Sequence, residues 1–203
     1  MAKKAFVYDG TQWVDIAQST ADLSTYQKSN RTGLQLVVPT GATGGTVGVN
    51  GAVTIGSAVS SITVNGAFTS TYDNYIIGIS GGAASGSTTL NLRLGATATN
   101  YYYQYMYTSW NNTFACDATT SATSWLYAGS AGVDGLSMNC NILSPNLAKV
   151  TRCNANGTGV LTTYIGNLNG MLNNTTQYSD FTILVGSGTV TGGTIRIYGY
   201  NNA

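Results

Sequence analysis

Catalysis by this chain would have to depend on aspartate, because the sequence has no histidine and all seven of its acidic residues are aspartates. General acid–base catalysis needs a histidine or a carboxyl group with a shifted pKa, and a pair of aspartates would give the glycosidase form of it. Turns, a helix start and strand positions explain most of them: Asp9, Asp15, Asp22, Asp73 and Asp134. Nothing in the sequence brings the other two, Asp117 and Asp180, together. We therefore expect no catalytic residues and no enzyme activity.

The densest group of aromatic side chains lies in a predicted strand at Asn100–Trp110. Alternate residues of a strand point to the same side, so four of its tyrosines share one face. A tyrosine ring packs while its hydroxyl group hydrogen bonds, which suits sugar stacking or a buried interface. With nearby aromatic residues, the candidate glycan contacts are Tyr101, Tyr103, Tyr105, Tyr107, Trp110, Trp125 and Tyr127. The alternative is that the row is buried between the subunits of a trimer or against a neighbouring sheet.

The three cysteines, Cys116, Cys140 and Cys153, follow no metal-ligand spacing. Cys140 alternates with apolar residues, so it is interpreted as a small buried side chain. Without histidine, a zinc site would need these thiols together with aspartate. We expect no metal and no cofactor.

The composition limits both the fold and the partners. Only 7% of residues are charged, the net charge is +1, and glycine, threonine and tyrosine are abundant while glutamate is absent. Strand and turn formers therefore dominate over helix formers. No basic cluster beyond Lys3–Lys4 is present for nucleic acid, and no apolar run is long enough for a membrane helix or a signal peptide. We expect synthesis in a cytoplasm without a signal peptide, no nucleic-acid partner and no membrane insertion.

From residue 34 onward, short strand patterns recur between glycine- and asparagine-rich turns. Leu90, Leu92 and Leu94 alternate with polar residues, as in a strand with one wet face. The segment Tyr75–Ile79 is continuously apolar apart from one glycine, which predicts burial on both faces. About ten such strands predict an all-β fold, an antiparallel β-sandwich in which jelly roll is preferred over an immunoglobulin-like order.

The N-terminal region has a different pattern. Residues 1–18 are predicted to hold a β-hairpin around a two-residue Asp9-Gly10 turn, and residues 19–33 a linker or short helix, before the sandwich at 34–203. An isolated hairpin is not stable in water, so its aromatic side chains should bury against a larger assembly, sister subunits or the chain's own sandwich. The candidate docking residues are Phe6, Tyr8 and Trp13. Ile16, Leu23 and Tyr26 have the spacing of a coiled-coil seam, which makes them the candidates for contact between the subunits of a trimer.

Several short motifs resemble structural proteins of tailed-bacteriophage particles. Lys4–Ile16 is similar to the "Y-[DN]-G-[ST]-x-W" hairpins of tail and fibre proteins, and Ala21–Tyr26 to the "ADLS-x-Y" linkers beside them. Phe68–Tyr75 and Leu90–Leu94, with the closing segment Thr194–Tyr200, resemble a distal jelly-roll-like domain of such proteins. The resemblance is to small trimeric tail-fibre or spike proteins and to capsid decoration proteins.

The resemblance implies a homotrimer in the virion that binds other phage proteins of the tail or capsid. It also implies synthesis in the cytoplasm of a bacterial host, and docking to the virion through Phe6, Tyr8 and Trp13. One reading is a fibre or spike that contacts host surface polysaccharide. A second is a capsid decoration protein, either cement or head fibre, that stabilises or coats the shell. A third is a polysaccharide depolymerase. It is less favoured, because the sequence has no histidine or glutamate to act in catalysis.

Overall fold

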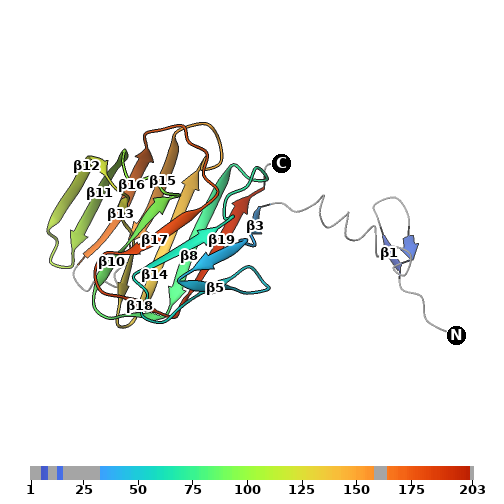
Figure 1. The fold of residues 1–203 in the computed structure, drawn as a ribbon, viewed down its shortest axis with the longest axis horizontal. Helices are drawn as coiled ribbons and strands as arrows, with labels where there is room; N and C mark the ends of the chain where they lie inside the picture. Colours follow the sequence, from blue (N-terminus) through green and yellow to red (C-terminus); the bar gives the residue numbers. More distant parts are fainter. Residues whose placement is uncertain (1–5, 9–12, 16–32, 158–163, 202–203) are drawn as a thin grey trace. The chain divides into compact units, whose positions relative to one another are not determined.

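The computed structural model describes residues 6–8, 13–15, 33–157 and 164–201 (Figure 1). The chain divides into two compact units, Met1–Gly33 and Leu34–Asn202. In the first unit β1 (Phe6–Tyr8) pairs antiparallel with β2 (Trp13–Asp15), so the predicted hairpin is present. Its register pairs Tyr8 with Trp13, which makes the connection longer than the predicted two-residue turn at Asp9-Gly10. The predicted linker or short helix at 19–33 lies almost entirely outside the described residues.

The second unit is all-β in its described residues, and its strand pairs are antiparallel, which confirms the predicted fold class. The described residues include no helix that is long and apolar enough to span a membrane. The main strands are β3 (Leu34–Leu36), β7 (Ser61–Asn65), β8 (Asn74–Gly81), β10 (Thr88–Leu94), β13 (Trp125–Gly132), β14 (Gly135–Leu143), β17 (Phe181–Val185) and β19 (Thr194–Tyr200).

These strands form two layers in jelly-roll order, and pairing of β13 with β14 joins the layers into one continuous sheet. One layer runs β3-β19-β8-β14 and the other β7-β17-β10-β13. Counted along the chain from 1 to 8, the orders are 1-8-3-6 and 2-7-4-5, so the first strand pairs with the last and the second with the one before it. We call these strands the body, together with the short strands β4 (Gly41–Thr43), β5 (Gly45–Val47), β6 (Val53–Ile55), β9 (Ala83–Ala84) and β18 (Val190–Thr191).

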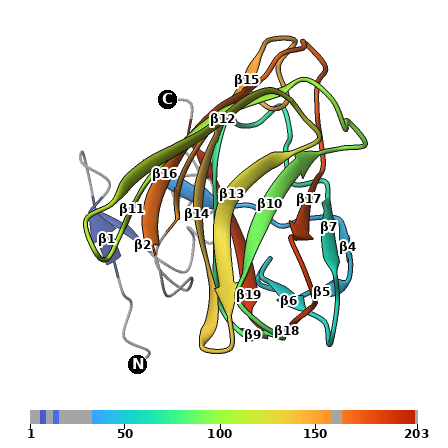
Figure 2. The ribbon, with the colours of Figure 1, turned by 90° about the vertical axis from the view of Figure 1, so that its left-hand side faces the viewer.

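Two insertions enlarge one sheet of the body. Between β10 and β13 the chain forms β11 (Tyr101–Ser109) and β12 (Phe114–Ala122), and between β14 and β17 it forms β15 (Thr151–Gly157) and β16 (Tyr164–Leu172). They continue the sheet in the order β14-β15-β16-β11-β12 and form the left-hand end of Figure 1. We call these four strands the extension. Figure 2, viewed from the side of the extension, shows β11 and β16 on one side of the molecule and β10, β17 and β7 on the other.

Strand β14 joins the two regions. One of its edges pairs with β8 along its whole length, while the other pairs first with β13 and then with β15. The sheet therefore divides at β14, and the extension is attached to the body through a continuous strand.

The body is held by a conventional apolar core. Leu90, Leu92 and Leu94 are all buried, as their alternation predicts, and they face the other sheet's apolar stripe, which includes Ile77 and Ile197. The prediction that Tyr75–Ile79 is buried on both faces is wrong. Its alternate residues Tyr75, Ile77 and Ile79 are buried, but Ile76 and Gly78 are only half-buried. The reason is that only one face of this sheet is covered by the second layer.

Candidate functional site

The tyrosine row of β11 faces the core. Tyr101, Tyr103 and Tyr105 are 0%, 7% and 3% exposed, and Trp125 is fully buried. The expectation that these four rings stack on a sugar is therefore wrong, because a ring inside the protein cannot meet a ligand. The alternative, packing against a neighbouring sheet, is what the structure has: the Tyr101 and Trp125 rings meet edge-on with centroids 5.1 Å apart, and Tyr105 and Tyr127 stack at 4.5 Å.

The remaining aromatic candidates differ in exposure. Tyr107 and Tyr127 are half-buried, and Tyr107 stacks on Tyr105 with centroids 5.3 Å apart. Trp110, which follows the end of β11, is 64% exposed. Among the predicted glycan contacts, Trp110 is thus the ring most accessible to a ligand.

Glycines on β16 make room for these rings. A Cβ atom at Gly170 would lie 2.6 Å from Nε1 of Trp125, and one at Gly166 would lie 2.6 Å from Cζ of Tyr105. Real Cβ atoms do not approach other atoms so closely. The core side of β16 therefore alternates glycine with leucine, so that bulky rings from β11 and β13 can lie against its backbone.

Two buried phenol groups have specific partners. The Tyr101 hydroxyl oxygen accepts a hydrogen bond of 2.7 Å from the backbone N–H of Leu94, and the Tyr103 hydroxyl donates one of 3.2 Å to Asp117. Burial raises the pKa of both phenols, and the negative charge of Asp117 raises the pKa of Tyr103 further. Both phenols therefore stay protonated at neutral pH.

The two aspartates without a sequence explanation have separate partners. Asp117 accepts from Tyr103 on the extension, whereas Asp180 accepts a 2.8 Å hydrogen bond from the backbone N–H of Gly66 in the body. Each carboxylate thus supports its own part of the fold. Within the described residues, no three histidine, cysteine, aspartate or glutamate side chains gather where a metal ion could bind.

The opposite, open face of the extension is lined by carboxamides. Register places Gln104, Asn169, Asn154 and Asn141 side by side on four adjacent strands, and Asn167 and Asn156 side by side in the next row, beside Met106. We define the amide face as Gln104, Asn141, Asn154, Asn156, Asn167 and Asn169. Except for Asn141, which is half-buried, these side chains are exposed to solvent. The amide face is therefore a continuous polar strip across β14, β15, β16 and β11.

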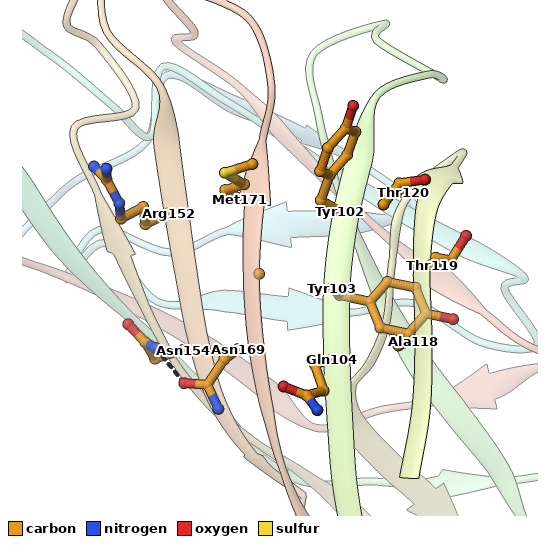
Figure 3. Close-up of a pocket in the computed structure, with 11 residues that line it drawn as sticks. Tyr102, Tyr103, Gln104, Ala118, Thr119, Thr120, Arg152, Asn154, Asn169 and Met171 are labelled. Atoms are coloured by element: carbon orange, nitrogen blue, oxygen red, sulfur yellow. Dashed lines mark hydrogen bonds between the residues drawn. The ribbon is translucent and has the colours of Figure 1, made fainter.

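Two shallow depressions lie along this strip. The first has a volume of about 770 Å³ and includes Tyr102, Gln104, Arg152, Asn154 and Met171 in its lining, as Figure 3 shows. The second, of about 530 Å³, adds apolar surface beside the amides. Its apolar lining includes Met106, Phe114 and Ile165, which are 37%, 67% and 42% exposed. The face thus combines amides with exposed apolar patches.

Charge on this surface is low. Among the described residues that line the two depressions, Arg152 is the one charged side chain. Asn154 donates a hydrogen bond of 2.7 Å to the side-chain oxygen of Asn169 (Figure 3), which orients both amides. Each amide can offer two donor hydrogens and an accepting oxygen. The arrangement can therefore hydrogen bond a neutral polar ligand.

Part of the amide face is visible in the sequence as an alternation of asparagine with buried residues. Asn154 and Asn156 alternate with buried Cys153 and Ala155, and Asn167 and Asn169 flank buried Leu168. Two strands with asparagine at two successive outward positions each predict an amide-rich surface. The register that brings them together was not readable from the sequence.

The other predicted sites are only partly described. Tyr8 is 51% exposed, while the side chains of the other docking candidates, Phe6 and Trp13, lie outside the described part of the chain. All three trimer-seam candidates, Ile16, Leu23 and Tyr26, also lie outside it. The buried interpretation of Cys140 is confirmed, and Cys153 is buried as well, whereas Cys116 is exposed.

No protein-family model matches the chain, and neither a curated protein nor a solved structure matches it. The functional argument therefore depends on the residues of this chain and on their arrangement.

Proposed function

We propose that this protein is a non-enzymatic structural protein of a bacteriophage particle, a trimeric fibre or spike domain that contacts host surface polysaccharide through the amide face. The observation that supports glycan contact is the in-register strip of carboxamides flanked by exposed apolar side chains. The phage assignment is supported by the motif resemblance at Lys4–Ile16, Phe68–Tyr75 and Thr194–Tyr200.

The chemistry of the amide face suits a neutral polysaccharide. Sugar hydroxyl groups both donate and accept hydrogen bonds, and the side-chain amides of asparagine and glutamine can also do both. The C–H faces of sugar rings pack on apolar surface, which Tyr102, Met106 and Phe114 offer beside the amides. The extended strip matches a chain of several sugars better than a single one, because amides recur over four adjacent strands.

The residues of the amide face support binding of a polysaccharide without its hydrolysis. Hydrolysis of a glycosidic bond by the usual route needs two carboxyl groups on either side of that bond. The described residues lining both depressions include no aspartate, and the chain has no glutamate. A bound polysaccharide would therefore leave this face unchanged.

Trimer formation is supported by a second surface, on the body. Leu34 and Leu36 on β3 are 46% and 42% exposed, and they pair in register with Tyr200 and Tyr198 on β19. Exposed apolar groups in a contiguous patch are typical of contact sites between proteins. Light scattering should give three times the single-chain mass of 21.1 kDa, and the double variant Leu34→Asn/Leu36→Asn should lower it. A wild-type mass equal to that of one chain would remove the trimer from the proposal.

Location on the particle tests the structural role. Electron microscopy of phage particles with a gold label on this protein should show the label at the tail. Label spread over the head shell would instead favour the capsid decoration reading, and particles without label would contradict both. Incubation of the protein with host polysaccharide should leave the polymer length unchanged, since shortening would indicate a depolymerase.

A further inference from the structure

A pair of buried thiols lies where the extension meets the body. Cys140 on β14 and Cys153 on β15 are both fully buried, and their Sγ atoms are 3.1 Å apart. Register pairs Cys140 with Ala155 and Cys153 with Ile142, so the two cysteines face each other across a diagonal of the strand pair. Their side chains point toward each other across the strand pair. No function described above uses this pair.

We propose that Cys140 and Cys153 are an oxidation site, at which hydrogen peroxide converts the two thiols into an intrachain disulfide. The Sγ atoms would have to approach by about 1 Å to reach the S–S bond length of about 2.05 Å. The two residues lie on adjacent strands that are already hydrogen bonded, so this approach needs a side-chain adjustment and a small shift of the strands. The inference stands independently of the phage assignment.

The reaction balances in two steps. A thiolate of one cysteine, having lost its proton, attacks one oxygen of hydrogen peroxide; the O–O bond breaks, a sulfenic acid forms, and the departing hydroxide takes up the proton to become water. The second thiol then attacks the sulfenic sulfur; an S–S bond forms, the S–O bond breaks, and the oxygen leaves as water with the second thiol's proton. Both sulfurs are oxidised, and one molecule of peroxide is reduced to two of water.

Burial should make the reaction slow but selective. Burial, together with the hydrogen bond and charge of the neighbouring Cys140, raises the pKa of the Cys153 thiol well above its ordinary value. Because the thiolate is the nucleophile, this thiol reacts slowly. The exposed Cys116 has no cysteine beside it among the described residues and would stop at a sulfenic acid or react with another molecule. Hydrogen peroxide is small and neutral, which makes it better suited to oxidise a buried pair than a larger oxidant.

The disulfide would fix the extension to the body. It would cross-link β14, which belongs to the body, with β15, the first strand of the extension. A cross-link restricts the unfolded chain and so stabilises the folded one. Oxidation outside a reducing cytoplasm would thus hold in place the strands that present the amide face.

The test uses the full-length chain with Cys116→Ser, so that the buried pair contains all of the remaining thiols. After treatment with peroxide and removal of the excess, intact-mass spectrometry should show the loss of two hydrogen atoms. Thiol titration in denaturant should then find no free thiol, and digestion should yield the Cys140 and Cys153 peptides joined. The thermal midpoint should rise and should return to its former value on reduction.

The control is Cys116→Ser/Cys153→Ala, treated in the same way, which should show no loss of two hydrogens. If this control does not fold, the joined peptides from the first variant still identify the bond. Two free thiols after prolonged treatment, oxygen added to Cys140 or Cys153 themselves in the digested peptides, or cross-linked dimers would each overturn the proposal.

Discussion

The body and the extension share one sheet, but they are stabilised in different ways. In the body, two layers enclose alternating aliphatic side chains such as Leu92, Ile77 and Ile183, which are fully buried. In the extension, aromatic rings lie against glycine backbone, with Trp125 over Gly170 and Tyr105 over Gly166. The outermost strand, β12, has no buried residue. The body therefore has a deep core, whereas the extension has a thin one.

This difference explains how one sheet provides both a scaffold and an exposed polar surface. In the body, β8 and β19 have apolar residues on their open side as well, including Ile76 and Tyr198. In the extension, the residues at the equivalent positions are amides. On one side of the extension, aromatic rings pack against glycine backbone and hold the strands together. The opposite side is not needed for this packing, so it can be polar. Substitutions on the packed side should therefore change the stability of the protein, whereas substitutions on the amide face should change polysaccharide binding.

The largest effect is expected in the body core. Leu92→Ala removes a fully buried side chain and leaves a cavity, which should lower the free energy of unfolding by about 2–5 kcal/mol. The matched control is Val49→Ala, which changes a fully exposed side chain and should alter stability by less than about 0.5 kcal/mol. Urea denaturation followed by circular dichroism measures both. A loss below about 1 kcal/mol for Leu92→Ala would contradict the assignment of the deep core to the body.

A smaller loss is expected from Gly170→Ala in the extension. The new Cβ atom would meet Nε1 of Trp125 at 2.6 Å and the backbone oxygen of Tyr102 at 2.9 Å, so overpacking should cost about 1–3 kcal/mol. Gly78→Ala on β8 is the matched control, because no atom lies within 4 Å of its Cβ position. Denaturation should show the control unchanged or slightly stabilised. Equal losses for the two variants would mean that ring-on-glycine packing does not secure the extension.

Alkaline pH should weaken the aromatic side of the extension. The pKa of Tyr103 is raised in the folded chain, so its contribution to stability is complete below the unfolded-state pKa of about 10 and is lost as the pH rises above it. Tyr103→Phe should cost about 1 kcal/mol at neutral pH through loss of the hydrogen bond to Asp117. It should also make the loss of stability above pH 10 less steep, since one titrating group is gone. Denaturation midpoints across this range measure both effects, and an unchanged slope would contradict the account.

The smallest effect on folding is expected on the amide face. Asn156 and Asn167 are exposed, so the double variant Asn156→Ala/Asn167→Ala should change the free energy of unfolding by no more than about 0.5 kcal/mol per site. Thermal or urea unfolding is a sufficient measurement. A loss of several kcal/mol would show that the amides are needed for folding. It would contradict the claim that only the packed side of the extension stabilises its strands.

The sequence predicted local alternation better than it predicted tertiary pairing. The Leu90–Leu94 stripe, the N-terminal hairpin and the all-β class followed from side-chain period and turn residues. Strand β12 was missed because its threonines, alanines and single aspartate give no apolar period, and it is held mainly by pairing with β11. The tyrosine row was identified, but whether it lay inside or outside depended on Trp125 and on the glycines of β16, which are distant in sequence.

The most direct test of glycan contact compares variants on an array of bacterial surface polysaccharides. The full-length chain, made multivalent on streptavidin, would be probed beside Asn154→Ala/Asn169→Ala and beside Gln177→Ala, which removes an exposed carboxamide outside the amide face. We predict that the wild type and Gln177→Ala bind one or more neutral polysaccharides, and that the double variant binds them at least about tenfold more weakly, a difference of about 1.4 kcal/mol. Equal binding by all three proteins, or no binding by the wild type, would contradict the assignment of the amide face as a glycan-binding surface.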